Sequence, residues 1–198
     1  QIQPADFNNI DQSYVVFNKN LALNLAKHFP DIDFQIITSQ EEASNFKSKR
    51  QLVFVDCPPT LDLFIETIQG NDKLPWTIFF YKNNQKYIEG LPSRKEIADV
   101  YKFIATHQNI PIDDKGVSLS KFLKIPIVRL HDVLKMFIEA EFVTIENRVL
   151  NPVKSPQKVD LTKTQTYRQL VDEITAEKYL IYSSFSELKQ QIINWLEE

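Results

Sequence analysis

The sequence predicts an α/β protein: a small Rossmann-like parallel sheet of about four strands with flanking helices, then a winged-helix-like module, then two C-terminal helices. Three observations support this prediction. Apolar strand candidates alternate with helices over the first ninety residues. Ile127–Leu150 changes from helical spacing to a strand pattern, and the last thirteen or so residues carry one apolar stripe. We place the domain boundaries at 1–91, 92–153 and 154–198.

The first segment alternates strand and helix patterns. Its strand candidates are short and apolar throughout, which is typical of strands covered on both faces. Ser39 and Glu42 have the spacing of a capping box, Thr60 is a candidate N-cap, and Gly70 is expected at the C′ position of the helix that Thr60 begins. The strands are predicted at Tyr14–Phe17, Phe34–Thr38, Leu52–Cys57 and Thr77–Tyr81, and the helices at Asn18–His28, Ser39–Lys47 and Thr60–Gln69.

The second segment has the element order of a winged-helix module. A helix over Pro92–Thr106 precedes a polar loop at Asp113–Gly116, and two further helices lead into a hairpin. Such modules dock on nucleic acid or on proteins and carry no chemistry of their own. The short helix is predicted at Ser118–Leu123, the longer one starts near Pro126 with Ile127, Leu130, Leu134, Phe137 and Ile138 on one face, and the hairpin turns at Glu146-Asn147.

The third segment begins with a linker, Asn151–Asp160, that contains two prolines. Thr162–Ile181 is predicted to be mostly helical, and Ser184 with Glu187 forms a capping box before the final helix. We expect the apolar stripe of that helix to pack on the first domain, with a dimer interface as the alternative. The stripe consists of Leu188, Ile192, Trp195 and Leu196.

Composition excludes several classes of protein. A hydrophobic content of 43% with 25% charged residues is typical of a folded chain rather than a disordered one. The net charge of −3 predicts no bulk attraction to nucleic acid or membranes, but residues 92–158 hold 11 Lys and Arg against 8 Asp and Glu, which favours a local polyanionic contact.

A few simple features of the sequence predict the cellular compartment and whether the chain is part of a longer protein. Cys57 is the one cysteine and lies in an apolar run, so we expect a buried, inert thiol. No apolar run approaches the roughly 18–20 residues that span a membrane. We therefore predict a cytoplasmic protein without a membrane partner. Because the chain begins at Gln1 without a methionine, we expect it to be a fragment of a longer protein.

No catalytic or metal-binding motif is present in the sequence. His28, His107 and His131 are far apart, and no metal-ligand spacing, phosphate-binding glycine loop or nucleophile elbow occurs. Asp56 ends a predicted strand, where α/β proteins often bind ligands. We favour a structural role in which its carboxylate accepts backbone N–H groups, and a small enzyme that uses Asp56 is a minor alternative.

Binding to nucleic acid is the remaining function that the residue types suggest. Lysine and arginine side chains would neutralise phosphates and release counterions. Asp132 and Glu139 share the exposed face of the longer helix, which argues against specific base reading and favours weak DNA contact, a protein contact or a structural role. The candidate contact residues are Lys121, Lys124, Arg129, Lys135, Arg148, Lys154 and Lys158.

Four motifs follow one another along the chain: GLPSRKEIADVYKFI (Gly90–Ile104), EAEFVTIENRVLNPV (Glu139–Val153), KVDLTKTQTYRQL (Lys158–Leu170) and LIYSSFSELKQQI (Leu180–Ile192). Together they resemble the C-terminal domain of bacterial single-stranded-DNA-specific exonucleases of the RecJ type. The resemblance covers about residues 50–198 and is strongest after Pro92. Arg148 departs from the family pattern, because glycine is expected after Glu-Asn in the hairpin turn, so we expect a longer or differently shaped turn.

The resemblance implies an accessory role in DNA repair and recombination. RecJ-type enzymes degrade single-stranded DNA from the 5′ end with two divalent ions, Mn²⁺ or Mg²⁺, held by an N-terminal core with a DHH signature. This chain has no such signature, so no catalytic residue and no cofactor is carried over. The implied partners are the rest of the parent exonuclease, single-stranded DNA, a single-strand-binding protein or a helicase. The alternative is a stand-alone winged-helix DNA-binding protein or regulator.

Overall fold

The computed structural model describes residues 3–83, 85–107 and 110–197. By contact, the chain forms two compact units: Gln1–Ile88 with Asp172–Glu198, and Glu89–Val171. The chain thus passes between the units close to the predicted boundary at residue 91 and again within the predicted C-terminal segment. The three domain boundaries themselves stay a prediction.

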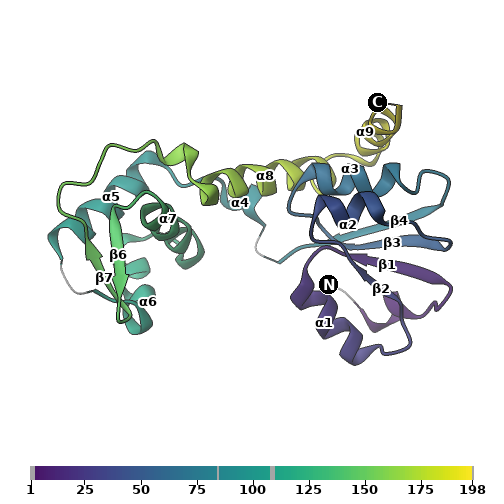
Figure 1. The fold of residues 1–198 in the computed structure, drawn as a ribbon, viewed down its shortest axis with the longest axis horizontal. Helices are drawn as coiled ribbons and strands as arrows, with labels where there is room; N and C mark the ends of the chain where they lie inside the picture. The colour runs from purple at the N-terminus through teal and green to yellow at the C-terminus, as the bar shows by residue number, and fades with distance from the viewer. Residues whose placement is uncertain (1–2, 84, 108–109, 198) are drawn as a thin grey trace. The chain divides into compact units, whose positions relative to one another are not determined.

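The first unit is built on a four-stranded parallel sheet with the strand order β2-β1-β3-β4. The sheet is covered on both faces, with α2 and α3 on one side and α1 on the other (Figure 1). Its elements are η1 (Pro4–Phe7), β1 (Gln12–Val16), α1 (Lys19–His28), β2 (Phe34–Ile36), α2 (Gln40–Asn45), β3 (Gln51–Asp56), α3 (Leu61–Gln69), β4 (Trp76–Tyr81) and α4 (Lys86–Glu89). The predicted parallel sheet of four strands is confirmed.

Side chains alternate between the two faces of the sheet along each strand, so the core of this unit has two parts. Val15 and Phe54 point to the face covered by α2 and α3, whereas Tyr14 and Val53 point to the face covered by α1. Both sets are buried, which explains why the strands are apolar at every position.

The C-terminal helices add to one face of this sheet. α8 (Gln165–Leu180) brings Ala176 and Leu180 into the core, and α9 (Phe185–Glu197) packs on α3. The apolar stripe of α9 contacts the first-unit core, so the predicted docking of this helix is confirmed. The predicted capping box is also present, because Ser184 Oγ accepts from the Glu187 N–H and the Glu187 carboxylate accepts from the Ser184 N–H.

The second unit surrounds a three-stranded antiparallel sheet with the order β5-β7-β6. Buried side chains of α5, α6 and α7 pack with Val143 and Leu150 from the sheet to form its core. Its elements are α5 (Arg94–Thr106), β5 (Ile110–Pro111), α6 (Ile112–Leu123), α7 (Ile127–Glu139), β6 (Val143–Glu146), β7 (Val149–Pro152) and η2 (Leu161–Lys163), followed by the start of α8.

Two predictions made from glycine residues were wrong. α6 begins at Ile112, so the polar loop predicted at Asp113–Gly116 is helical. A Cβ added at Gly116 would lie 3.5 Å from Ile127 Cδ1, an ordinary van der Waals contact, so packing does not require the glycine, although it costs about 1 kcal/mol in a helix. Gly70 has φ −68° rather than a left-handed conformation, and a Cβ there would lie 2.7 Å from Lys47 Nζ.

The hairpin turn also differs from the prediction. Asn147 and Arg148 form a two-residue turn with φ values of 49° and 62°. The turn lies one position later in the sequence than predicted, and it is not lengthened as we expected from Arg148. Four residue pairs join β6 to β7, and Val143 and Leu150 are buried in the core. Because this packing fixes the register, Arg148 adopts a left-handed conformation that glycine would favour. β7 also extends to Pro152, into the predicted linker.

Candidate DNA-contact surface and a polar crevice

α7 is the central helix of the second unit. Leu130, Val133, Met136 and Phe137 are buried along one face, which fixes how the helix lies on the core. Its opposite face is exposed at Ile127, His131 and Lys135. The face available to a partner is therefore part apolar and part basic.

The seven candidate cations lie in four parts of the second unit: the end of α6, α7, the hairpin turn and the segment after β7. Lys121 and Lys124 are exposed at the end of α6, where Lys124 caps the helix with φ 55°. Lys135 is exposed on α7, and Arg148 is exposed in the hairpin turn. Lys154 and Lys158 are exposed in the segment after β7, and Arg129 lies in a different environment from the other six.

Arg129 is committed to an internal ion pair. Its Nη1 lies 2.7 Å from Glu96 Oε1, its Nη2 donates to the Glu89 carbonyl, and the two side chains are only 18% and 20% exposed. Burial alone would raise the pKa of Glu96, but hydrogen bonds from Ser93 and the charge of Arg129 lower it. The guanidinium therefore joins α7 to the start of α5 and has little capacity left for a phosphate.

Glu139 also has an internal role. Its two carboxylate oxygens accept hydrogen bonds from the Thr166 N–H at 3.0 Å and from Thr166 Oγ1 at 2.5 Å. The carboxylate stays at the exposed end of α7, as the sequence predicted, while Asp132 is half-buried. Of the two carboxylates on α7, the exposed one thus lies at the C-terminal end of the helix, one turn after Lys135.

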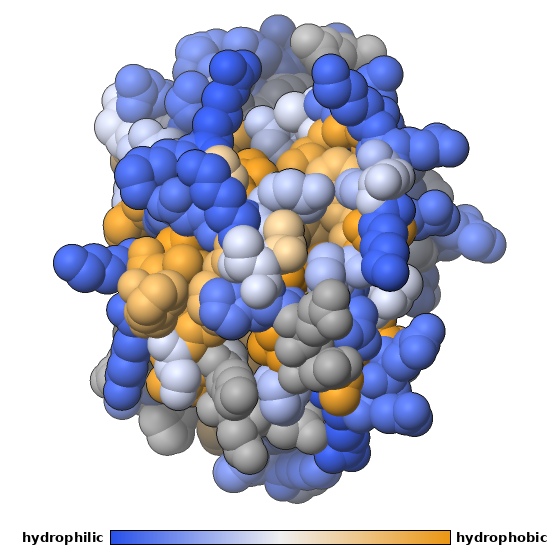
Figure 2. Space-filling view, turned by 90° about the vertical axis from the view of Figure 1, so that its left-hand side faces the viewer, coloured by the Kyte–Doolittle hydropathy of each residue, from blue (hydrophilic) through white to orange (hydrophobic). Residues whose placement is uncertain are grey.

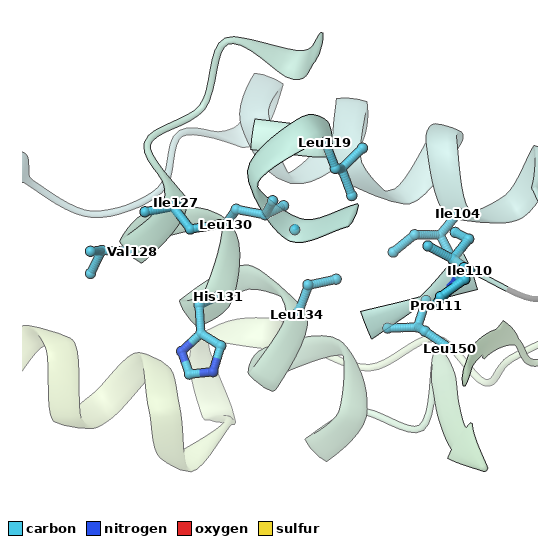
Figure 3. Close-up of a pocket in the computed structure, with 11 residues that line it drawn as sticks. Ile104, Ile110, Pro111, Leu119, Ile127, Val128, Leu130, His131, Leu134 and Leu150 are labelled. Atoms are coloured by element: carbon cyan, nitrogen blue, oxygen red, sulfur yellow. The ribbon is translucent and has the colours of Figure 1, made fainter. Parts of the chain in front are cut away.

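An apolar cavity of about 370 Å³ opens beside α7. Figure 3 shows leucine side chains from α6 and α7 facing Ile110 of β5 and Leu150 of β7. Among its lining residues, His131 is the one with a titratable side chain. On the face drawn in Figure 2, hydrophobic side chains also reach the surface in patches between hydrophilic ones. A cavity of this composition suits an apolar side chain rather than a phosphate.

The first unit has a polar crevice of about 390 Å³ at the carboxyl ends of β1, β3 and β4. Asp56 accepts hydrogen bonds from the Phe17 N–H at 2.8 Å and the Asn18 N–H at 2.9 Å, which confirms its predicted structural role. Burial raises the pKa of the neighbouring Cys57 thiol to about 12, as expected for an inert cysteine.

Lys82 follows an irregularity at the end of β4 and enters this crevice. The register of β3 with β4 shifts between Phe54 and Asp56, and Phe80 has φ 46°. Lys82 Nζ lies 3.1 Å from Glu173 and 3.4 Å from Glu177. Burial would lower the pKa of Lys82, but the two carboxylates outweigh that effect and raise it.

Glu177 is the residue of this crevice that sequence reasoning missed. It is fully buried, and its carboxylate accepts from the N–H groups of Lys86 at 3.1 Å and Tyr87 at 2.8 Å, at the start of α4. These partners are some ninety residues away in sequence, so no local pattern links them. The sequence around Glu177 also mixes charged and apolar residues, so nothing in it marks this glutamate as buried.

The buried Asp56 predicts a specific pH dependence of stability. Burial raises the pKa of Asp56 to about 6, against opposing effects of the two N–H groups and Lys82. The folded state therefore binds this proton more tightly than the unfolded chain, so stability from this group is present below pH 4 or so and is lost as pH rises through about 6. A shift of about 2 pKa units corresponds to up to about 3 kcal/mol.

Urea unfolding of the wild type and of Asp56→Asn between about pH 4 and pH 7.5 tests this prediction. The difference in unfolding free energy, wild type minus variant, is expected to fall by up to about 3 kcal/mol as pH rises. A difference that rises with pH would show that the hydrogen bonds to the ionised carboxylate outweigh its burial.

Two kinds of site are not seen among the described residues. No group of three or more His, Cys, Asp and Glu side chains there is arranged to hold a metal ion. None of the helices in the described ranges is long and apolar enough to cross a membrane.

Comparison with known proteins places the chain in a family. Residues 3–192 match the family described as "Single-strand DNA-specific exonuclease, C terminal domain", so the match includes the first fifty residues, where the sequence resemblance was weak. The single-stranded-DNA-specific exonuclease RecJ of Bacillus subtilis (strain 168) is 29% identical over 161 residues, which are 80% of this chain and 20% of that protein. The chain thus spans about a fifth of the length of this relative, and no solved structure matches it. The chain belongs to the family of single-strand DNA-specific exonuclease C-terminal domains.

Proposed function

We propose that this chain is a non-catalytic accessory domain of a single-stranded-DNA-specific 5′–3′ exonuclease, and that its second unit contacts DNA. The observation that carries the proposal is the order of elements in that unit. α5, β5, α6, α7, β6 and β7 follow one another, and the sheet has the order β5-β7-β6. Two helices joined by a short turn and followed by a hairpin are the arrangement of a winged helix, in which α7 would be the recognition helix and β6–β7 the wing.

Charge supports contact with DNA through this unit rather than the first. Residues 89–171 hold 13 Lys and Arg against 10 Asp and Glu, whereas the remaining residues hold 10 against 16. Of the seven candidates, we keep the six exposed cations and assign Arg129 to its internal pair with Glu96. The surface of this unit carries carboxylates as well as cations, so only a few positive charges would act on DNA together. We therefore expect contact with phosphates but no recognition of individual bases.

Catalysis would belong to the rest of the parent enzyme. The relative is about five times as long as the matched region, and the DHH signature expected of the catalytic core is absent from this chain. We place the two Mn²⁺ or Mg²⁺ ions in that core. The first unit, a Rossmann-like sheet, would serve as the support from which the second unit reaches DNA. A single-strand-binding protein and a helicase are the further partners that we propose for the parent enzyme in repair and recombination.

Binding of the chain to a labelled single strand of about 20 nucleotides at several salt concentrations tests the proposal. The triple variant Lys121→Ala, Lys124→Ala, Lys135→Ala is expected to bind at least about tenfold more weakly at low salt. Its slope of log affinity against log salt should be smaller by about 2, because three phosphate contacts are lost at about 0.7 each.

The control variant removes three exposed lysines of the first unit, Lys27, Lys73 and Lys189, and should bind DNA like the wild type. Equal losses in the two triple variants would contradict a localised surface. In the parent exonuclease, removal of this domain should lower the length of DNA degraded per binding event while leaving the core able to cleave.

A second candidate is a protein contact, which the apolar cavity beside α7 favours. The same lysine variant separates the two functions. A protein partner that inserts an apolar side chain into the cavity would bind the triple lysine variant as it binds the wild type, whereas DNA would bind the variant more weakly.

A further inference from the structure

Within the part of the chain that the structure describes, no strand pairs with the outer edge of β6. β6 is at the end of the sheet order β5-β7-β6, and Glu146 pairs with Val149 across the two-residue turn. In an antiparallel hairpin, hydrogen-bonded residue pairs alternate with pairs that are not hydrogen-bonded. The Val153 N–H donates to the Phe142 carbonyl at 3.0 Å, which fits this alternation counted from the pair Glu146–Val149. Val143 and Ile145 therefore direct their N–H and C=O groups away from β7, towards the edge.

A groove of about 740 Å³ runs along this edge, and we call it the wing groove. All four residues of β6 line it, together with residues 138–141 at the end of α7 and part of the segment 153–159. Because consecutive strand residues point to opposite faces, lining by all four places the groove beside the strand edge rather than over one face. Its volume lies in the range of about 300–1,000 Å³ that is typical of ligand sites.

The groove has an apolar component that is open to solvent. Ile138, Ile145 and Val159 line it and remain 39%, 46% and 43% exposed. They come from α7, β6 and the segment after β7, three parts of the chain that are separate in sequence. Alternate side chains of an added strand would cover such positions.

The charged residues that line the groove are all acidic. They are Glu139, Glu141 and Glu146, and no lysine or arginine is among the lining residues. The Glu139 carboxylate also accepts hydrogen bonds from Thr166. Glu141 and Glu146 are exposed, and the structure shows no ion pair for them among the described residues. This charge would repel DNA and also a second copy of the same edge.

We propose that the wing groove binds an extended, lysine- or arginine-rich segment of a partner protein, which adds to the sheet beside β6. Backbone groups of Val143 and Ile145 pair with the added strand, apolar side chains of the segment cover Ile145 and Val159, and its cations face Glu141 and Glu146. Strand addition of this kind gives affinity through main-chain hydrogen bonds and specificity through alternate side chains. The site differs in chemistry from the proposed DNA contact, since it uses carboxylates where DNA requires cations, although Lys154 and Lys158 of that contact belong to the segment that borders the groove.

A capped peptide of alternating lysine and valine, eight residues long, is the probe for this proposal. It is expected to bind the chain, and the variant Glu141→Gln, Glu146→Gln should weaken binding at least about tenfold at low salt. The matched control, Asp31→Asn with Asp72→Asn, makes the same change of charge at exposed carboxylates of the first unit and should bind normally. Amide hydrogen exchange at Val143 and Ile145 should slow in the complex, because these N–H groups become bonded.

Several results would overturn the proposal. One is that a peptide with glutamate in place of lysine binds as tightly as the lysine peptide. Another is that the control variant loses as much affinity as Glu141→Gln, Glu146→Gln. A third is that amide hydrogen exchange at Val143 and Ile145 does not change when the peptide binds. Tight self-association of the chain that the peptide does not displace would instead assign the groove to a second copy. A peptide in which alternate backbone nitrogens are methylated should not bind if the segment adds as a strand.

Discussion

Replacing Glu177 by alanine is expected to lower the free energy of unfolding by about 3–5 kcal/mol, because the change removes one partner from a buried ion pair. The carboxylate is fully buried, and its loss leaves the N–H groups of Lys86 and Tyr87 without their acceptor. Lys82 would keep one partner, Glu173, at 3.1 Å. Urea denaturation followed by tryptophan fluorescence measures the effect, since Trp76 and Trp195 both belong to the first unit.

Glu173→Ala is the matched control for this prediction. It removes the same charge from the same helix and from the same lysine, but Glu173 is half-buried and bonds no backbone N–H of α4. We expect a loss of about 1 kcal/mol or less, as for partly exposed ion pairs. Similar losses in the two variants would show that the pair with Lys82, and not the anchoring of α4, is what Glu177 contributes.

Replacing Arg129 by alanine is expected to destabilise the second unit by about 2–4 kcal/mol. The change leaves Glu96 in a largely buried position without its cation and leaves the Glu89 carbonyl without a donor. Hydrogen exchange of the buried amides in α7 is a suitable measurement, because no tryptophan lies in this unit.

Lys135→Ala provides the contrast for Arg129. Lys135 is exposed on the same helix, so its loss should change stability by less than about 0.5 kcal/mol while weakening DNA binding. If Arg129→Ala folded with unchanged stability and lost DNA binding as Lys135→Ala does, the assignment of Arg129 to a structural pair would be wrong.

Local patterns predicted most of the first unit. The strands of the parallel sheet, the N-caps Ser39 and Thr60 and the capping box at Ser184 all depend on residues within a few positions of one another. These signals are local in the folded protein as well, so periodicity and capping rules were sufficient to place them. The apolar stripe of α9 also predicted its own burial, because it had to be covered.

The errors arose where tertiary packing overrides local preference. Gly116 was interpreted as part of a loop, although α6 continues through it as part of a helix that packs on the core of the second unit. Arg148 was expected to lengthen the hairpin turn, although pairing of β6 with β7 fixes a two-residue turn. The two-residue strand β5 and the four-residue helix α4 are too short to show any periodicity.

The candidate surface was only partly predictable for the same reason. A list of lysines and arginines in the basic segment contains Arg129 as readily as Lys135, since sequence does not show which cation finds an internal carboxylate. Glu96 is 33 residues from Arg129, and Glu177 is about ninety residues from the N–H groups that it accepts. The wing groove likewise depends on β6 being the edge strand, which follows from the pairing of β5 with β7.

A nuclease assay with the purified 198-residue chain tests the central claim most directly. The substrate is a 5′-labelled single strand, incubated with Mn²⁺ or Mg²⁺, while binding is followed in the same sample by fluorescence anisotropy. We predict that the strand is bound in a salt-dependent manner and remains intact. Release of labelled nucleotides in proportion to the amount of this chain would contradict a role confined to binding.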